Sequence, residues 1–299
     1  MKPSVPPNAV RVNDVWNQSG VKYSFCSLVT DLSAYNNMIS SAEHAGFCGA
    51  DVEYLYIDNV LANEFDGYSG LNALLSTAKG EMIVLCHQDV LFEFDGRREL
   101  DRTLKDLSDL DPNWAVCGNT GGVGLGRLAI RITDPHGSDR FVEKLPKRVH
   151  SLDENFIIAK RSANLAVSGD LKGFHLYGTE LCLLAEARGY SSYVVDFHVH
   201  HLSGGFRDAS FEQIREAMIL KYHRFFRNRW IMSSCTVMYL SGSTILTRIL
   251  NQDIVVRLAR RVASWFAIRN DRHGRQSVVD RKPALTLDRD VTIEKDVEV

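Results

Sequence analysis

Apolar runs of strand length alternate with amphipathic stretches along the first third of this chain, and that alternation limits what it can fold into. Residues 23–30 (YSFCSLVT), 52–57 (VEYLYI) and 81–86 (EMIVLC) are the apolar runs, and residues 33–45 and 68–78 between them have the apolar spacing of helices. Strands that alternate with helices form parallel β-α-β units. The pattern therefore predicts an α/β fold with a mostly parallel central sheet flanked by helices.

An acidic residue follows each of these three predicted strands, namely Asp31, Asp58 and Asp89. In open parallel sheets ligands bind beyond the carboxyl ends of the strands, where the loops diverge. Aspartate is also common in turns and at helix N-caps, and Asp31 is assigned to that ordinary role. Asp89 differs because it ends the compact polar sequence HQD after a continuous apolar strand. A divalent cation held by this carboxylate would keep open positions for phosphate oxygens.

Residues 118–126 (GNTGGVGLG) are rich in glycine, as dinucleotide-binding loops are. Such a loop must open a helix, whereas residues 127–132 (RLAIRI) alternate like a strand. We therefore predict a flexible loop beside the site. Beyond it, the sequence predicts strands at 156–159 and 193–199 and a helix at 179–188.

Three histidines lie in residues 196–201 (DFHVHH). Strand alternation places His198 and His200 on one face and His201 at the strand end or in a turn. Two imidazoles on one face can bind a metal, and partly exposed strand histidines beside the glycine loop at 203–205 are an equal alternative. A zinc site that includes Cys86 or His87 would lack the usual ligand spacing.

Glu180 lies in the sequence HLYGTEL, where Gly178 forms a turn and Thr179 is a plausible helix N-cap. The helix dipole favours an ionised carboxylate in a first turn, which suits a general base. The ordinary alternative is a glutamate that only stabilises the start of its helix. Asp153 and Glu154 are the next candidates for a base.

Four segments together resemble glycosyltransferase family 2, with the GT-A fold, and especially the branch related to streptomycin-biosynthesis glycosyltransferase-like proteins. The resemblance covers residues 23–205, about two thirds of the chain. Its carriers are SLVTDLSAYNNMISS, YIDN, GLNALLSTAKGEMIVLCHQDV, and GFHLYGTELCLLAEARGY followed by HVHHLSGG. None is specific alone.

The resemblance implies roles for individual residues. Asp89 matches the metal-binding last position of the family's D-x-D motif, and His87 replaces its first acid. His200 or His201 matches a later metal-side histidine, and Glu180 stands where relatives commonly have the catalytic base. The residues implied to contact or approach the nucleotide are Thr30, Asp58, Asn72, His87 and Gln88.

The resulting prediction is a metal-dependent glycosyltransferase that uses Mn²⁺ or Mg²⁺. It would move a sugar from a nucleotide-sugar donor (UDP, dTDP or GDP sugar) to a glycan or lipid-linked acceptor, as in polysaccharide biosynthesis. One base and no evident enzyme nucleophile favour inversion. The alternatives are an inactive relative that acts as a glycan-binding or assembly module, and a sugar nucleotidyltransferase. The latter needs a basic, glycine-rich loop near the first strand, which SLVTDLSAYNN lacks.

Charge separates the last third of the chain from the rest. The whole chain has a formal net charge of -2, which gives no reason to expect nucleic-acid binding. Residues 207–275, by contrast, contain 13 Lys or Arg and 5 Asp or Glu. Interleaved aromatic residues make an anionic membrane surface one expected partner. A packed helical subdomain or a homo-oligomer contact is the other interpretation.

The predicted organisation has four parts. Residues 1–19 form a leader without the apolar core of a secretory signal, and residues 20–206 form the GT-A domain. Residues 207–270 form a helical extension with helices at 211–232 and 245–268, and residues 271–299 form a disordered tail. Six scattered cysteines without a C-x-x-C pair predict buried, reduced thiols in a cytoplasmic protein, peripheral at the inner face of the membrane if the basic segment binds lipid.

Overall fold

The chain divides into two compact units, residues 1–220 and residues 221–299. The computed structural model describes residues 20–205, 209–232, 236–262 and 265. The predicted leader and tail, residues 1–19 and 271–299, lie outside the described residues. The expected domain boundary at residue 206 falls 14 residues before the division between the units, which lies within helix α6 (Ala209–Phe225).

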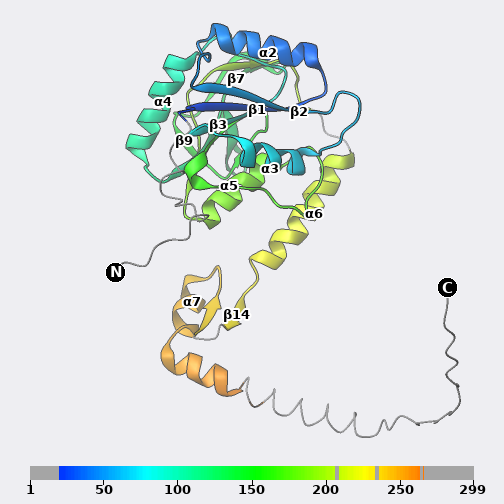
Figure 1. The fold of residues 1–299 in the computed structure, drawn as a ribbon. Helices are drawn as coiled ribbons and strands as arrows, with labels where there is room; N and C mark the ends of the chain where they lie inside the picture. The colour runs from blue at the N-terminus through cyan, green and yellow to red at the C-terminus, as the bar shows by residue number, and fades with distance from the viewer. Residues whose placement is uncertain (1–19, 206–208, 233–235, 263–264, 266–299) are drawn as a thin grey trace, which may run out of the picture. The chain divides into compact units, whose positions relative to one another are not determined.

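A seven-stranded sheet forms the centre of the first unit (Figure 1). Strand β1 (Tyr23–Val29) pairs in parallel with β2 (Val52–Asp58) on one side and β3 (Met82–Cys86) on the other. The strand order is β2-β1-β3-β11-β5-β12-β9, with β5 (Trp114–Gly118), β9 (Lys147–Val149), β11 (Phe156–Lys160) and β12 (Ser191–Val194). Strand β11 lies antiparallel between β3 and β5. The predicted α/β fold class, with a central sheet flanked by helices, is confirmed.

Helices cover both faces of this sheet (Figure 1). On one face, α2 (Leu32–His44) and α4 (Arg97–Leu110) pack into a core that includes Tyr23, Phe25 and Trp114, all at most 1% exposed. On the other face lie α3 (Gly67–Thr77) and α5 (Tyr177–Ala187). A 3-10 turn, Arg161–Ala163, follows β11. Helix α4 was not among the predicted elements, although its buried leucines, at 100, 104 and 107, have helical spacing.

Local chemistry explains where the first helices begin. The Asp31 carboxylate accepts hydrogen bonds from the backbone N–H groups of Ser33 (2.8 Å) and Ala34 (3.2 Å), so it caps α2. Asp66 and Ser69 form a reciprocal capping box at the start of α3. The ordinary capping role predicted for Asp31 is therefore what the structure shows.

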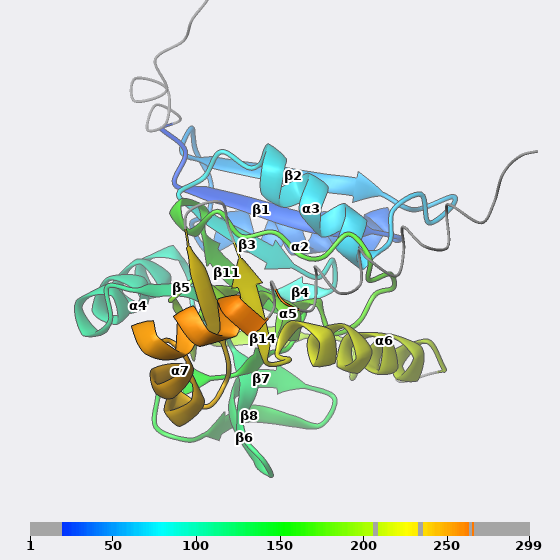
Figure 2. The ribbon, with the colours of Figure 1, turned by 90° about the horizontal axis from the view of Figure 1, so that it is seen from below.

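A second sheet lies beside the carboxyl ends of the first, in the order β10-β6-β7-β13-β4, with β8 paired to β7 (Figure 2). Its strands are β4 (Val90–Leu91), β6 (Thr120–Gly124), β7 (Arg127–Asp134), β8 (Gly137–Val142), β10 (Ser151–Leu152) and β13 (Val199–His201). The prediction of a flexible loop at 118–126 was wrong, because β6 pairs with both β7 and β10. A Cβ on Gly121 would lie 2.3 Å from the Ser151 carbonyl oxygen, so glycine here permits close strand packing.

The predicted strand at 193–199 is two strands in two sheets. Strand β12 ends at Val194 in the first sheet, and β13 begins at Val199 in the second. In between, the backbone N–H of His198 donates to the Asp95 carboxylate (2.7 Å), outside either ladder. The alternation of side chains therefore does not continue through residues 193–199. Alternation from the first sheet cannot predict the directions of His198, His200 and His201.

The second unit contains less helix than predicted. Helix α6 ends at Phe225, and β14 (Arg229–Met232) pairs with β15 (Val237–Leu240) as a small antiparallel ribbon. Helix α7 (Thr244–Leu250) is followed by its C-cap residue, Asn251. The Asn251 side chain accepts a hydrogen bond from the Tyr239 N–H and donates one to the Tyr239 carbonyl. A further helix begins at residue 253 and is described to residue 262. Among the described residues, no helix has the length and apolar character needed to cross a membrane.

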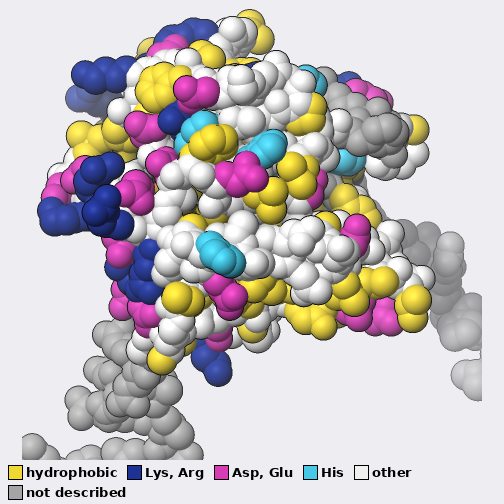
Figure 3. All heavy atoms as spheres, turned by 90° about the horizontal axis from the view of Figure 1, so that it is seen from above, with side chains coloured by type: hydrophobic (Ala, Val, Ile, Leu, Met, Phe, Trp, Pro, Cys, Tyr) yellow, Lys and Arg dark blue, Asp and Glu magenta, His cyan; other side chains and the backbone are white. Residues whose placement is uncertain are grey.

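The charges on the visible face of the first unit are mixed. Figure 3 shows basic side chains gathered on the α4 side with acidic side chains among them. Lys22 pairs with Asp101 (2.8 Å) and Arg97 with Asp51 in this region. All five described cysteines are free, and four of them are buried while Cys48 is exposed.

Candidate functional site

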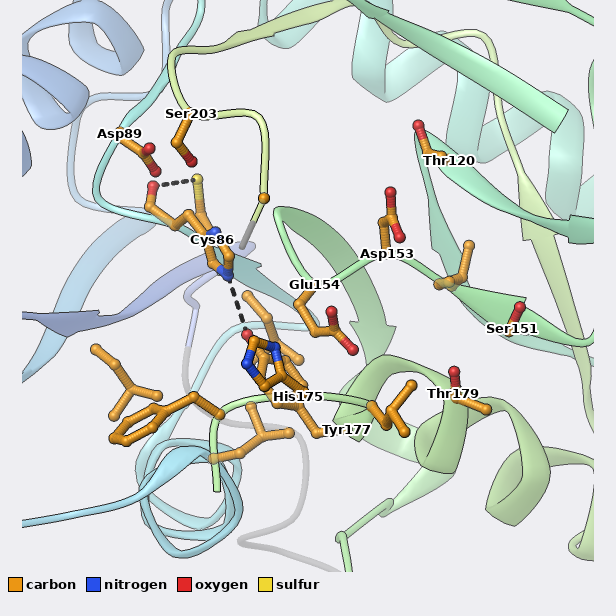
Figure 4. Close-up of a pocket in the computed structure, with 18 of the residues that line it drawn as sticks. Cys86, Asp89, Thr120, Ser151, Asp153, Glu154, His175, Tyr177, Thr179 and Ser203 are labelled. Carbon is orange, nitrogen blue, oxygen red and sulfur yellow. Dashed lines mark hydrogen bonds between the residues drawn. The ribbon is translucent and has the colours of Figure 1, made fainter. Parts of the chain in front are cut away.

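A cleft of about 1000 Å³ opens in the first unit at the carboxyl ends of β1 and β3. The ends of these strands supply Thr30 and the HQD residues at 87–89. The second sheet contributes residues 120–122, the turn after β10 contributes Asp153 and Glu154, and the start of α5 contributes Tyr177 (Figure 4). The cleft therefore lies where ligands bind in open parallel sheets.

Three side chains converge at one end of the cleft. His87, Asp89 and His201 each offer a ligand atom, and these atoms all lie within 4.8 Å of one another. The His201 Nε2 atom is 3.4 Å from Asp89 Oδ1 and 3.1 Å from the Ser203 hydroxyl. The His87 and His201 ring centres are 5.5 Å apart. Two imidazoles and a carboxylate in this arrangement can hold a metal ion.

The electrostatics of this cluster suit metal binding at neutral pH. Burial, with a smaller contribution from His201, lowers the pKa of His87 to about 4, so its ring is neutral. Burial alone would raise the pKa of Asp89, but the hydrogen bonds and charge of His201 and the Ser203 hydroxyl outweigh it and hold that pKa well below its usual range. Metal ligands must be deprotonated, and both groups meet this condition.

Tyr177 is a contact of this cluster that the sequence did not single out. Its hydroxyl lies 3.2 Å from His87 Nε2. A metal-binding histidine usually donates its second ring N–H to a neighbour, which fixes the ring. A His87 tautomer with its proton on Nε2 would donate to Tyr177 and keep the Nδ1 lone pair for a cation.

Gln88, the middle residue of HQD, connects the ends of β1 and β3. Its side-chain oxygen accepts from the backbone N–H groups of Thr30 (2.8 Å) and Asp31 (2.9 Å), and its amide donates to the Thr30 hydroxyl (2.9 Å). Thr30 and Gln88 both line the cleft. Gln88 thus fixes the loop on which Thr30 stands.

Asp58 and Asn72 are absent from the lining of the cleft. Asp58 is exposed at the end of β2 and accepts from the Val60 N–H (3.0 Å), while its buried neighbour Asn59 does line the cleft. The Asn72 amide bonds both backbone groups of Val167, at 2.9 and 2.8 Å. In this structure Asn72 holds the segment after β11 against α3.

The three histidines of DFHVHH diverge. His198 stacks on Phe94 with ring centres 3.9 Å apart and contacts the Thr133 hydroxyl. His200 Nδ1 lies 2.8 Å from a Glu93 carboxylate oxygen and is not part of the cluster of potential metal ligands. Only His201 reaches Asp89. The expected placement of His198 and His200 on one face toward a metal is therefore corrected. The reason is that β13 begins only at Val199, so His198 lies before the strand and the two rings do not share a strand face.

Glu180 is completely buried and is not among the residues that line the cleft. Its two carboxylate oxygens accept hydrogen bonds from Ser168, one from the backbone N–H (2.9 Å) and one from the hydroxyl (2.5 Å). Helix α5 begins at Tyr177, two residues before the predicted start, and Glu180 lies in its first turn, as predicted. The geometry thus does not support the expected base role for Glu180, and it supports a structural one.

The fold and the site together define an α/β protein with three potential metal ligands at the carboxyl edge of its sheet. A protein described as "ATP synthase subunits region ORF 6" from Fuscovulum blasticum is 36% identical over 219 residues, which span 71% of this chain and 88% of that protein. The chain belongs to the family of this ORF 6 protein. No model of a known protein family matches the chain.

The chain has a low similarity to two solved structures. The mannosyltransferase PcManGT from Pyrobaculum calidifontis, in complex with GDP-Man and Mn²⁺, has a TM-score of 0.45 and 12% identity over 68% of this chain and 64% of that one. GalNAc-T7 with UDP, GalNAc and Mn²⁺ has a TM-score of 0.44 and 9% identity over 67% and 48%. The chain thus spans less than two thirds of either protein.

Proposed function

We propose that this protein is a metal-dependent glycosyltransferase that takes its sugar from a nucleotide-sugar donor. The observation that carries the proposal is the convergence of His87, Asp89 and His201 in a cleft at the carboxyl ends of β1 and β3. The sequence resemblance to glycosyltransferase family 2 agrees with it, since Asp89 and either His200 or His201 match that family's metal-side positions. A UDP, dTDP or GDP sugar is the proposed donor.

The residues present fit a divalent cation. His87, Asp89 and His201 would hold it, with Tyr177 and Ser203 supporting the two rings. When bound, the cation would neutralise the charge that develops on the leaving diphosphate. Because two of the three ligands are nitrogens, Mn²⁺ suits the site better than Mg²⁺, which prefers an all-oxygen shell.

The remaining cleft residues support donor placement. Thr30 is on the loop fixed by Gln88, and Asn59 lies at the end of β2, where the nucleoside would meet the parallel strands. Asp58 and Asn72 do not line the cleft, and we retain them as proposed neighbours of the nucleoside just outside that lining. In the transfer, an acceptor hydroxyl of a glycan or lipid-linked saccharide attacks the anomeric carbon, and inversion follows from a single displacement.

The proposal is tested by nucleotide binding. UDP, dTDP and GDP are each titrated by calorimetry with and without Mn²⁺, and melting temperature is followed in parallel. We expect one of the three to bind with Mn²⁺ and at least about tenfold more weakly without it. Binding of none of them would reject the donor site. Binding without turnover of any sugar would favour the alternative of an inactive glycan-binding or assembly module.

His201→Ala is expected to weaken Mn²⁺-dependent nucleotide binding by about 10- to 100-fold, because this ring is the one that reaches Asp89. His200→Ala is the matched control, since His200 adjoins it in the same strand but pairs with Glu93. The control should bind within about twofold of the parent protein. Calorimetric titration of both variants decides, and the reverse order of effects would move the cation site to His200.

The second unit supports a proposal for location, at an anionic membrane surface. Residues 221–262 contain eight Lys or Arg and one acid, Asp253. No residue of α7 is buried. Large apolar side chains of this unit are exposed alongside the arginines: Phe225, Phe226, Trp230, Met238, Leu240, Ile245, Leu246, Ile249, Ile254, Leu258, Val262 and Trp265. Apolar groups beside basic ones are the signature of an interfacial segment.

Reversing three of these charges, Arg257, Arg260 and Arg261 to Glu, is expected to abolish flotation with anionic vesicles. Each basic residue near such a surface contributes about 1 kcal/mol, so the partition coefficient should fall at least about 100-fold. Glu substitutions at Arg98, Arg102 and Lys105 of α4 are the matched control. Equal flotation of the two triple variants would count against a lipid surface and favour an oligomer contact, which sedimentation would show.

A further inference from the structure

The side of the cleft away from the cation cluster is also polar and is not explained by donor binding. It is formed by the turn between β10 and β11 and by the adjoining strand β6. Figure 4 shows Glu154 between the Asp89 side of the cleft and the strands that bear Thr120 and Ser151. The polar residues that line this side are Thr120, Ser151, Asp153, Glu154 and Thr179.

Thr120 indicates that this side receives a ligand. Its residue is 9% exposed, and its hydroxyl oxygen is buried with no hydrogen-bond partner among the described residues. Leaving a buried hydroxyl unpaired costs about 1–3 kcal/mol, so a polar group of a ligand in the cleft that Thr120 lines would gain by pairing with it. The Thr120 carbonyl accepts from the Asp153 N–H (2.9 Å), which places this hydroxyl directly beside the turn that carries Glu154.

The surroundings of Glu154 suit a role in proton transfer. It is half-buried and lines the cleft beside the start of α5, where the backbone at Gly178 and Leu176 favours its ionised form. Its carboxyl group has lone pairs for a further partner. Its titratable neighbours are Asp153 in the same turn and Tyr177 and Cys182 in α5.

We propose that this side of the cleft is the acceptor subsite for a hydroxylated carbohydrate, and that Glu154, not Glu180, takes the proton of the attacking hydroxyl. The proposal rests on the proposed function. The acceptor oxygen forms a bond to the anomeric carbon as the bond from that carbon to the diphosphate oxygen breaks. The electron pair of the broken bond leaves with the nucleoside diphosphate, and the hydroxyl proton moves to Glu154.

The ionisation of Glu154 agrees with this role. Burial, and then the charge of Asp153, raise the pKa of Glu154 to about 7, and the nearby backbone of α5 opposes the rise only in part. A base works best when its pKa lies near the working pH. The ionised fraction of Glu154 increases as the pH rises through 7, so turnover should increase over the same range and then level off.

The test is Mn²⁺-dependent release of nucleoside diphosphate from UDP-glucose, dTDP-glucose and GDP-mannose, with water as the acceptor. Glu154→Gln should lower turnover by about 100- to 10,000-fold and leave nucleotide affinity within about twofold. It should also remove the rise in rate through pH 7, whereas Glu154→Asp should restore part of the rate. Glu186→Gln, at an exposed position of α5, is the matched control and should keep both the rate and the pH dependence. Asp153→Asn should instead move the midpoint below pH 7, because the charge of Asp153 raises the pKa of Glu154.

A second variant tests the acceptor subsite even if Glu154→Gln impairs folding. Thr120→Val removes the unpaired hydroxyl, so it should not lower the melting temperature, yet it should raise the KM for a saccharide acceptor. A Glu154→Gln protein with normal turnover and normal nucleotide binding would overturn the base assignment. Nucleotide binding with no turnover by the parent protein would also overturn it. Failure of nucleotide binding itself would instead reject the proposed donor site.

Discussion

Asp89→Asn is expected to abolish Mn²⁺-dependent binding of the nucleoside diphosphate. The change keeps the size of the side chain but removes the only carboxylate of the His87, Asp89 and His201 cluster. Asp89 is held ionised by His201 and Ser203, so its charge is available to a cation at neutral pH. Because loss of even an outer partner of a metal site costs 10- to 100-fold in affinity, removal of a ligand should cost about 100-fold or more.

Calorimetric titration of the nucleotide, with and without Mn²⁺, measures this effect. Asp109→Asn is the control, because Asp109 is an exposed residue of α4 whose carboxylate contacts Lys105. Binding without metal should be unchanged in both variants. If Asp89→Asn still responds to Mn²⁺ as the parent protein does, the cation binds elsewhere and the cluster has another role.

The first half of the sheet was predictable because its signals are local. The strands β1, β2 and β3 are short apolar runs, and α2 and α3 between them are amphipathic, so their positions were predicted to within about two residues. Periodicity of this kind depends only on which face of an element is buried. Asp89 was identified for the same reason, since it ends an apolar strand.

The second sheet was not predictable in the same way. Strand β6 contains three glycines, and glycine is a loop signal unless a close contact requires it. That contact is made by Ser151, which lies about thirty residues further along the chain. Non-local pairing of this kind leaves no period in the sequence.

The choice between His200 and His201 also depended on distant pairing. Strand β13 has three residues, and its register against Val90 and Leu91 of β4 decides which ring turns toward Asp89. His201 pairs with Val90, next to Asp89, while His200 lies opposite Leu91 and turns to Glu93. No alternation within residues 196–201 carries that information.

Glu180 shows how an error of two residues in a helix start changes the chemistry. The sequence predicted Thr179 as the N-cap and Glu180 in the first turn. Leu176 is the actual cap, with a positive φ of 64°, and the Glu180 N–H already donates to the Leu176 carbonyl. Glu180 is still in the first turn, but at this later helical position its side chain is completely buried and meets Ser168.

Replacing Glu180 is accordingly expected to change stability far more than turnover. Glu180→Leu places a slightly shorter apolar side chain at this position and leaves the Ser168 N–H and hydroxyl without their acceptors. Since an unpaired buried donor costs about 1–3 kcal/mol, the free energy of unfolding should fall by about 2 kcal/mol or more. For a domain of this size, the melting temperature should fall by several degrees.

The rate supplies the second half of this prediction. Glu180→Gln retains an acceptor oxygen for Ser168, so its folded protein should release nucleoside diphosphate within about threefold of the parent rate. Glu186→Leu, at an exposed position of the same helix, is the stability control and should change the free energy of unfolding by less than about 0.5 kcal/mol. Loss of turnover by 100-fold in Glu180→Gln, with its melting temperature intact, would return the base role to Glu180. Stable folding of Glu180→Leu would show that the Ser168 contact contributes little, because water then replaces the lost acceptors.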